Sequence, residues 1–80
     1  MANETEVYEA LAEIFRDAFM RDDLRLTPEL SAADVQGWDS LKQIEIIVAT
    51  EGRFGIRLNS RELDNLRTVG DLARVVMAKL

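Results

Sequence analysis

Ser40 is the side chain in this sequence best suited to carry a covalent group, and it lies in the string Gly37-Trp38-Asp39-Ser40-Leu41. A loop-like stretch precedes it and an apolar helical pattern follows, so we expect its hydroxyl at an exposed helix N-terminus. Backbone N–H groups and the helix dipole stabilise negative charge there, which suits a phosphodiester on this oxygen. We expect Leu41 to face inward and anchor the first turn. Asp-Ser before an apolar helix is also a common cap, and the tripeptide alone does not separate the two roles.

The 80 residues include no cysteine and no histidine. Without cysteine the chain has no disulfide, no zinc–thiolate site and no thiol nucleophile. Without histidine it lacks the usual general base near neutral pH, so it cannot assemble a Ser-His-Asp triad by itself. The composition therefore argues against a self-contained hydrolase or thiol enzyme.

The net charge of −5 is unevenly distributed along the chain. Residues 1–39 carry ten acidic and three basic side chains, whereas residues 40–80 carry five acidic and seven basic ones. An acidic chain without a basic cluster suits protein partners with basic patches and does not suit nucleic acid. No apolar run approaches the roughly 18 residues of a membrane span, and the acidic N-terminal stretch does not resemble a signal peptide. We expect one cytoplasmic domain over residues 1–80, without a membrane span.

Apolar side chains recur at three- and four-residue steps in the N-terminal quarter and predict a helix over about residues 4–20, capped by Asn3 or Thr5. Residues 21–38 read as a long loop that scattered leucines and a valine pin to the core, with room for a short helical turn near 31–35. The apolar positions of the first helix are Val7, Leu11, Ile14, Phe15, Ala18 and Phe19.

A second helix is predicted from Ser40 to Arg53, with Asp39 or Ser40 as its cap and Gly52 and Gly55 at its end. Its run of β-branched residues also fits a strand, but the cap and the glycines favour helix. Helical spacing places on one side of it Leu41, Ile44, Ile47, Val48 and Glu51.

A short helical segment is predicted over Arg61–Leu66, capped by Ser60, with Leu63 and Leu66 facing inward. A last helix begins near Thr68 or Val69. Its expected buried stripe is Val69, Leu72, Ala73, Val76 and Leu80. The fold predicted from these segments is all-α: a small antiparallel bundle of three main helices plus one short helix, with a long loop between the first two.

Four features in order along nearly the whole chain resemble the acyl and peptidyl carrier proteins. They are the attachment-like motif Asp39-Ser40-Leu41, the helix pattern Ile44, Glu45 and Val48, the exit Phe54-Gly55-Ile56, and the last-helix opening Leu66-Arg67-Thr68-Val69-Gly70-Asp71-Leu72. The ordered set is far more specific than the tripeptide at Ser40.

The resemblance implies a discrete, stand-alone carrier. A phosphopantetheinyl transferase would attach 4′-phosphopantetheine from coenzyme A to Ser40, and the thiol of that arm would hold acyl or aminoacyl cargo as a thioester. Ser40 would then be a tether and not a catalyst, and the missing cysteine is no obstacle. Further implied partners are a loading ligase, adenylating enzyme or acyltransferase, and a downstream synthase or transferase. We expect a monomer.

The resemblance also implies site residues around Ser40. Asp39 and Leu41 would lie beside the arm. The expected partner-docking residues are Trp38, Leu41, Lys42, Ile44, Glu45 and Val48. Trp38 is expected mainly to pack the junction between loop and helix, although its position also allows contact with the arm or a partner.

Several positions depart from the fatty-acid carriers in the family. Lys42 and Arg53 stand in a helix that is typically acidic there, which indicates either neutral surface exchange or dedicated docking partners. Thr50 replaces a large apolar residue, and it either bonds back to a helix carbonyl or marks a shallow groove for short or polar cargo. We predict a carrier of a specialised pathway (polyketide, nonribosomal peptide or aminoacyl-carrier). The alternatives are an ordinary fatty-acid carrier and an unmodified helical interaction module.

Overall fold

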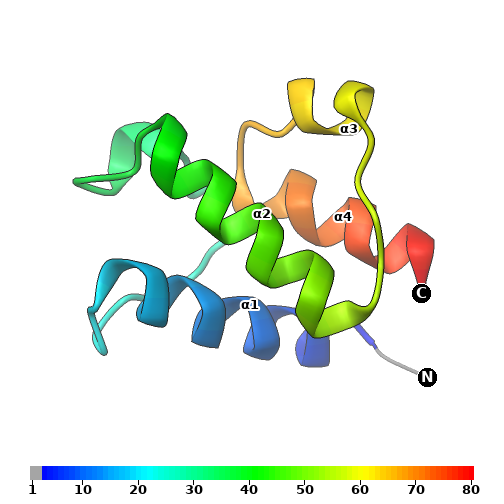
Figure 1. Ribbon diagram of the computed structural model, residues 1–80. Coiled ribbons are helices and arrows are strands. Elements are labelled where there is room, and N and C mark those ends of the chain that lie inside the picture. The colour runs from blue at the N-terminus through cyan, green and yellow to red at the C-terminus, as the bar shows by residue number, and fades with distance from the viewer. Residues whose placement is uncertain (1–2) are drawn as a thin grey trace.

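The computed structural model describes residues 3–80, and these form an all-α bundle around one apolar core, which confirms the predicted fold. Residues 1–2 of the predicted domain lie outside the described residues. Figure 1 shows that α2 and α4 both run opposite to α1, and both pack against it. The elements in chain order are α1 (Glu4–Phe19), the 3-10 helix η1 (Ala32–Asp34), α2 (Ser40–Phe54), α3 (Ser60–Asp64) and α4 (Val69–Lys79).

Helix α1 matches its prediction to within a residue. Asn3 is its cap, because the Asn3 side chain accepts a hydrogen bond from the Glu6 N–H at 2.9 Å. The helix ends at Met20, whose φ of 53° lies in the left-handed region. The side that meets α2 and α4 buries Val7, Ala10, Leu11, Ile14 and Phe15. Phe15 and Leu11 are among the largest fully buried side chains, so α1 supplies much of the core.

The long loop between α1 and α2 is held to the core at several points. Leu24 and Val35 are buried, as the scattered apolar pattern predicts, and η1 confirms the short helical turn. The Val69 N–H donates to the Leu30 carbonyl and the Gly70 N–H donates to the Pro28 carbonyl, both at 2.9 Å. The loop is therefore tied by its backbone to the beginning of α4, which fixes the approach of the chain to Ser40.

The side predicted for α2 is right for Ile47, which is buried, and wrong for its other apolar residues. The buried residues are Ile46, Ile47 and Thr50, whereas Leu41, Ile44 and Val48 are exposed by 60% or more. The physical reason is that α2 carries apolar side chains around most of its circumference, so two different helical stripes satisfy the same periodicity. Contact with α1 selects one stripe, and the other faces solvent. Gly55, with φ of 67°, ends the helix, while Gly52 lies inside its last turn.

Smaller corrections concern the last two helices. Asn59 caps α3, since its side chain accepts the Glu62 N–H at 2.8 Å, and Ser60 is the first helical residue. Leu63, predicted to face inward, is 36% exposed because a one-turn helix covers little of the core. Leu80 is half exposed because it follows the last turn of α4. The remaining predicted stripe of α4 is buried: Val69, Leu72, Ala73 and Val76.

Candidate functional site

Ser40 is exposed at the first position of α2, directly after its cap. The Asp39 carboxylate accepts the Lys42 N–H at 2.9 Å, and the Asp39 carbonyl accepts the Gln43 N–H at 2.9 Å. The first two N–H groups of the helix, those of Ser40 and Leu41, have no helical acceptor. Within residues 3–80 no hydrogen bond engages the Ser40 hydroxyl. The site therefore presents a reachable oxygen next to free donors.

The backbone before Ser40 turns at Gly37, which has a φ of 89°. A residue with a β-carbon rarely adopts this conformation, so glycine is the suitable residue here. The Trp38 N–H donates to the Val35 carbonyl at 3.2 Å, and the Asp39 N–H donates to the Gly37 carbonyl at 3.1 Å. The turn directs Trp38 toward the core and leaves Ser40 on the surface.

Trp38 packs the junction between loop and helix, as expected. Its ring meets Phe15 edge-on at 5.2 Å between centroids and Phe19 at 6.1 Å. Its indole N–H donates to the Gln43 side-chain oxygen at 2.6 Å. Gln43 was not predicted as a site residue. Its position three residues after Ser40, on the same helix face, is the signal that identifies it.

Lys42 is directed toward the domain rather than toward solvent. Its ammonium donates to the Ala18 carbonyl at 2.8 Å, lies 3.1 Å from the Glu45 carboxylate, and sits 5.7 Å from the centre of the Phe19 ring. Ala18 belongs to the last turn of α1, where carbonyls lack helical partners and the helix dipole favours a cation. Lys42 and Glu45, both expected at the docking surface, are thus bonded to each other.

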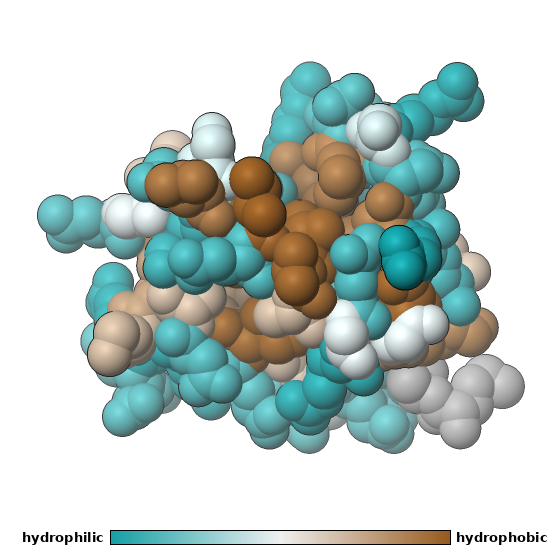
Figure 2. Space-filling view, in the orientation of Figure 1, coloured by the Kyte–Doolittle hydropathy of each residue, from teal (hydrophilic) through white to brown (hydrophobic). Residues whose placement is uncertain are grey.

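An apolar strip of exposed side chains follows Ser40 along α2, and we call it the α2 stripe. It consists of Leu41, Ile44 and Val48, exposed by 73%, 60% and 61%. The expectation that Leu41 anchors the first turn from inside is therefore wrong; the same contact with α1 that buries Ile46 turns Leu41 outward. Figure 2 shows apolar surface gathered over α2 and continuing toward α3. Contiguous exposed apolar surface of this kind is typical of a protein contact site.

An open groove of about 520 Å³ adjoins Ser40 between α2 and α3. It includes Ser40, Asp39 and Trp38 and joins them to Ile44 of the α2 stripe. Four lining residues were not predicted as site residues: Ala32, Gln43, Leu63 and Leu66. The groove thus brings together half of the expected site, and it leaves Leu41, Lys42, Glu45 and Val48 outside.

Thr50 makes the hydrogen bond to a helix carbonyl that was one of the two explanations for a polar residue at this position. Its side chain is fully buried, and its hydroxyl donates to the Ile46 carbonyl at 2.7 Å. This is the bond back to the preceding helical turn. Arg53, the other basic departure, pairs with Glu13 of α1 at 2.8 Å. Both side chains therefore contact the domain itself.

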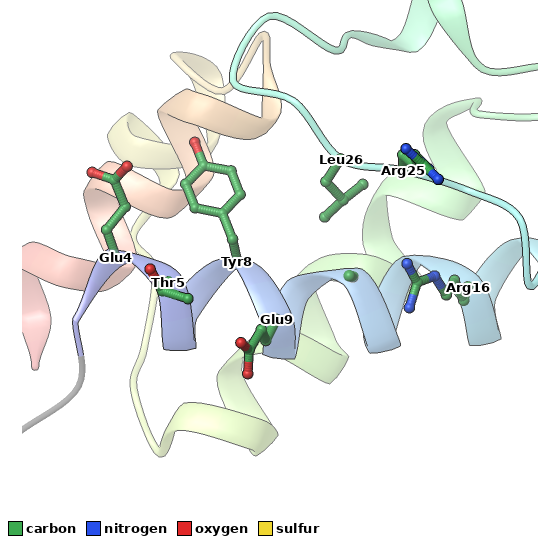
Figure 3. Close-up of a pocket in the computed structure, with 8 residues that line it drawn as sticks. Glu4, Thr5, Tyr8, Glu9, Arg16, Arg25 and Leu26 are labelled. Carbon is green, nitrogen blue, oxygen red and sulfur yellow. The ribbon is translucent and has the colours of Figure 1, made fainter.

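A second open groove, of about 490 Å³, runs along α1 and does not include Ser40. Figure 3 shows Glu4 and Tyr8 rising from α1 while Arg25 and Leu26 approach from the loop. Burial, with Glu4 and Glu29 nearby, raises the pKa of Tyr8.

Among residues 3–80, no cluster of three acidic side chains has the arrangement of a metal site, and no helix is long and apolar enough to cross a membrane.

The Ser40 site fits a phosphopantetheine arm. The two free N–H groups at the start of α2 can receive phosphate oxygens, and the helix dipole favours the charge of a phosphodiester. Asp39, the acidic residue next to Ser40 in the chain, turns its carboxylate onto the Lys42 N–H. When bound, the arm supplies the thiol that this chain lacks, and the residues present would hold its phosphate end and leave the rest free.

Comparisons with known proteins identify the family of the chain. The profile of the phosphopantetheine attachment site family matches residues 9–76. The chain is 36% identical to the meromycolate extension acyl carrier protein of Mycolicibacterium aurum, over 94% of this chain and 77% of that protein. It is 39% identical to an acyl carrier protein of Acidothermus cellulolyticus, over 82% of this chain and 79% of that one.

Among solved structures, the fold is similar to the holo acyl carrier protein of Geobacter metallireducens, with a TM-score of 0.86 and 42% identity, over 91% of this chain and 84% of that one. Phosphopantetheine, the cofactor expected from the sequence, is the prosthetic group of this family. The family's members are carriers and generally not catalysts. The chain belongs to the acyl carrier proteins, within the phosphopantetheine attachment site family.

Proposed function

We propose that Ser40 is the attachment point of the phosphopantetheine arm. The observation that carries the proposal is its position as an exposed, unbonded hydroxyl at the first residue of α2, between the groove and the α2 stripe. The Ser40 oxygen would displace the adenosine 3′,5′-bisphosphate part of coenzyme A at phosphorus, with the hydroxyl proton leaving to a base on the transferase. The chain has no histidine that could serve as this base.

The test is incubation with coenzyme A and a broad-specificity phosphopantetheinyl transferase, followed by intact-mass and peptide mass spectrometry. The expected result is the addition of one phosphopantetheine, located on Ser40. Ser31 is a matched control, because Ser31→Ala changes another serine before a helical turn and leaves α2 intact. Ser40→Ala should abolish the adduct and Ser31→Ala should not. An adduct that persists in Ser40→Ala would falsify the assignment, and no adduct in the wild type would favour an unmodified helical interaction module.

The loaded carrier would pass its cargo between partner enzymes. Its partners would be the transferase, a loading ligase, adenylating enzyme or acyltransferase, and a downstream synthase or transferase. Docking would centre on the α2 stripe, which is exposed and follows the attachment point. Trp38 is assigned to packing instead of docking, and Lys42 to the junction with α1.

We propose a specialised pathway over ordinary fatty-acid synthesis. The supporting observation is that both basic departures on α2 are paired within the domain, Lys42 with Glu45 and Arg53 with Glu13, so fewer free carboxylates face a basic partner. The test compares cargo transfer from this holo protein and from a fatty-acid carrier to a fatty-acid ketosynthase. Weak transfer from this protein supports the specialised role. Equal transfer would show an ordinary fatty-acid carrier.

A further inference from the structure

A wall of three side chains separates the groove beside Ser40 from a very small space inside the bundle. The outer groove holds about 520 Å³, and the inner space holds about 10 Å³. Both are lined by Trp38, Gln43 and Leu66. Only the outer groove also includes Ser40, Ile44 and Leu63. Only the inner space also includes Phe15, Ile46, Val69 and Leu72.

The wall is fixed by contacts on both of its faces. The Trp38 indole N–H donates to the Gln43 side-chain oxygen at 2.6 Å. The Trp38 ring also rests edge-on against Phe15, which is fully buried. Moving Trp38 or Gln43 would leave a partly buried donor and acceptor without partners and would break aromatic contacts. The closed arrangement is therefore the favoured one.

In this closed arrangement the space behind the wall is too small for an extended chain. A volume of about 10 Å³ is barely enough to hold one water molecule. The side chains around it leave little freedom, because Phe15 and Val69 are fully buried and Ile46 is nearly so. Protein interiors packed in this way do not deform without losing contacts. To enter, an apolar chain of several carbons would have to displace the wall side chains and take up the volume that they fill.

We propose that the Trp38–Gln43 pair keeps cargo out of the core, so that this carrier holds short or polar acyl or aminoacyl groups in the outer groove. The proposal rests on the attachment of the arm to Ser40. The outer groove suits such cargo because it is open to solvent and combines the Gln43 amide and Asp39 carboxylate with small apolar surfaces. A long chain lying there would keep much of its surface in water, with no burial to favour it.

The experiment incubates the unmodified protein with the broad-specificity transferase and acetyl, alanyl or octanoyl coenzyme A, so that each acyl-phosphopantetheine arm is transferred whole to Ser40, and mass spectrometry first verifies each product. Methyl NMR then follows two sets of residues that the geometry separates. The groove set is Ile44 and Leu63, and the core set is Ile46, Val69 and Leu72. We expect every cargo to shift only groove-set resonances. Octanoyl-dependent shifts in the core set of the wild type would overturn the proposal.

A variant tests the wall itself. Gln43→Ala removes the acceptor of the Trp38 N–H and the side chain that separates the two spaces, so octanoyl should now shift the core set. Gln36→Ala is the matched control, because Gln36 is exposed and lies outside both spaces. Core-set resonances that stay unmoved in octanoyl-loaded Gln43→Ala would show that Gln43 is not the barrier. Failure of Ser40 to accept the arm at the first step would reject the proposed function instead, so the two failures are distinguishable.

Discussion

Lys42 shows how one side chain can be misread as surface charge when it serves the fold. Its ammonium joins the beginning of α2 to the end of α1 through the Ala18 carbonyl and lies 5.7 Å from the centre of the Phe19 ring. The sequence offered two explanations for a lysine at this position: a neutral exchange of surface charge, or a change of docking partners. The contacts add a third explanation, which is that Lys42 stabilises the fold. It supplies a cation and a hydrogen-bond donor at the end of α1, where the carbonyls lack helical partners.

We expect Lys42→Met to destabilise the domain by about 1–2 kcal/mol, because it keeps the apolar stem but removes a charged hydrogen bond to a helix end. Arg74→Met is the matched control. Arg74 makes only an exposed pair with Asp71 at 3.6 Å, so its loss should cost about 0.5 kcal/mol or less. Urea unfolding measures both. Equal stabilities for the two variants, together with slower cargo transfer in Lys42→Met, would instead assign Lys42 to docking.

At the scale of elements, the close approach of the loop to α4 depends on Gly70. A β-carbon at Gly70 would meet the Pro28 carbonyl oxygen at 2.9 Å and the Pro28 Cα at 3.3 Å. We expect Gly70→Ala to cost about 1–3 kcal/mol, because backbone on both sides must shift. Gly52→Ala is the control, since nothing lies within 4 Å of its β-carbon, and it should stabilise α2 by about 0.5–1 kcal/mol. Thermal unfolding compares them, and a stabilised Gly70→Ala would contradict the close contact.

Asp71, in the first turn of α4, should make the free energy of unfolding of the domain depend on pH in the acid range. The Asp71 carboxylate accepts the N–H groups of Arg67 and Thr68 at 3.0 and 3.2 Å, and these bonds hold the pKa of Asp71 below its usual range. Hydrogen bonding by the Asn59 N–H, and by Lys79, likewise lowers the pKa of Glu62. Because these pKa values are lower in the folded state, their stabilisation is present above the unfolded pKa and is lost as the pH falls through the folded pKa.

Asp71→Asn should therefore be less stable than the wild type near neutral pH by about 1 kcal/mol, the usual worth of a helix cap. The difference should shrink as the pH falls below about 4, since the wild type then protonates Asp71. Thermal unfolding at a series of pH values measures this. A constant difference across the acid range would show that the charge of Asp71 does not matter.

The elements themselves were largely predictable, and the orientation of α2 was not. Caps and glycines mark helix ends locally, so α1 and α4 were predicted within a residue or two. Helix α2 has apolar residues on two sides, and only its tertiary contact with α1 decides that Ile46 is buried and Leu41 exposed. The pattern of residues within α2 cannot predict which side is buried, because the buried side is set by contact with α1, which is separated from α2 by 20 residues.

At the scale of the whole molecule, the groove at Ser40 arises from three separate segments. Ala32 of η1, the start of α2, and Leu63 with Leu66 of the α3 region meet there. The motif at Ser40, together with the ordered features that follow it up to Leu72, was enough to propose the attachment point from the sequence. Gln43 and the wall to the core were not foreseen, because they require the side chain of Trp38 to be placed against Phe15 and α2 together.

The α2 stripe leads to a prediction for the assembled carrier and its partners. Leu41 and Ile44 are largely exposed, so Leu41→Ala and Ile44→Ala should leave the free energy of unfolding within about 0.5 kcal/mol of the wild type. If partners bury these side chains, each variant should lower kcat/KM for phosphopantetheinylation by about tenfold, equivalent to a contact of more than about 1 kcal/mol. Met20→Ala is the control, because Met20 is 90% exposed and lies outside the stripe. Initial rates of adduct formation measure all three, and equal loss in Met20→Ala would mean that docking does not select the α2 stripe.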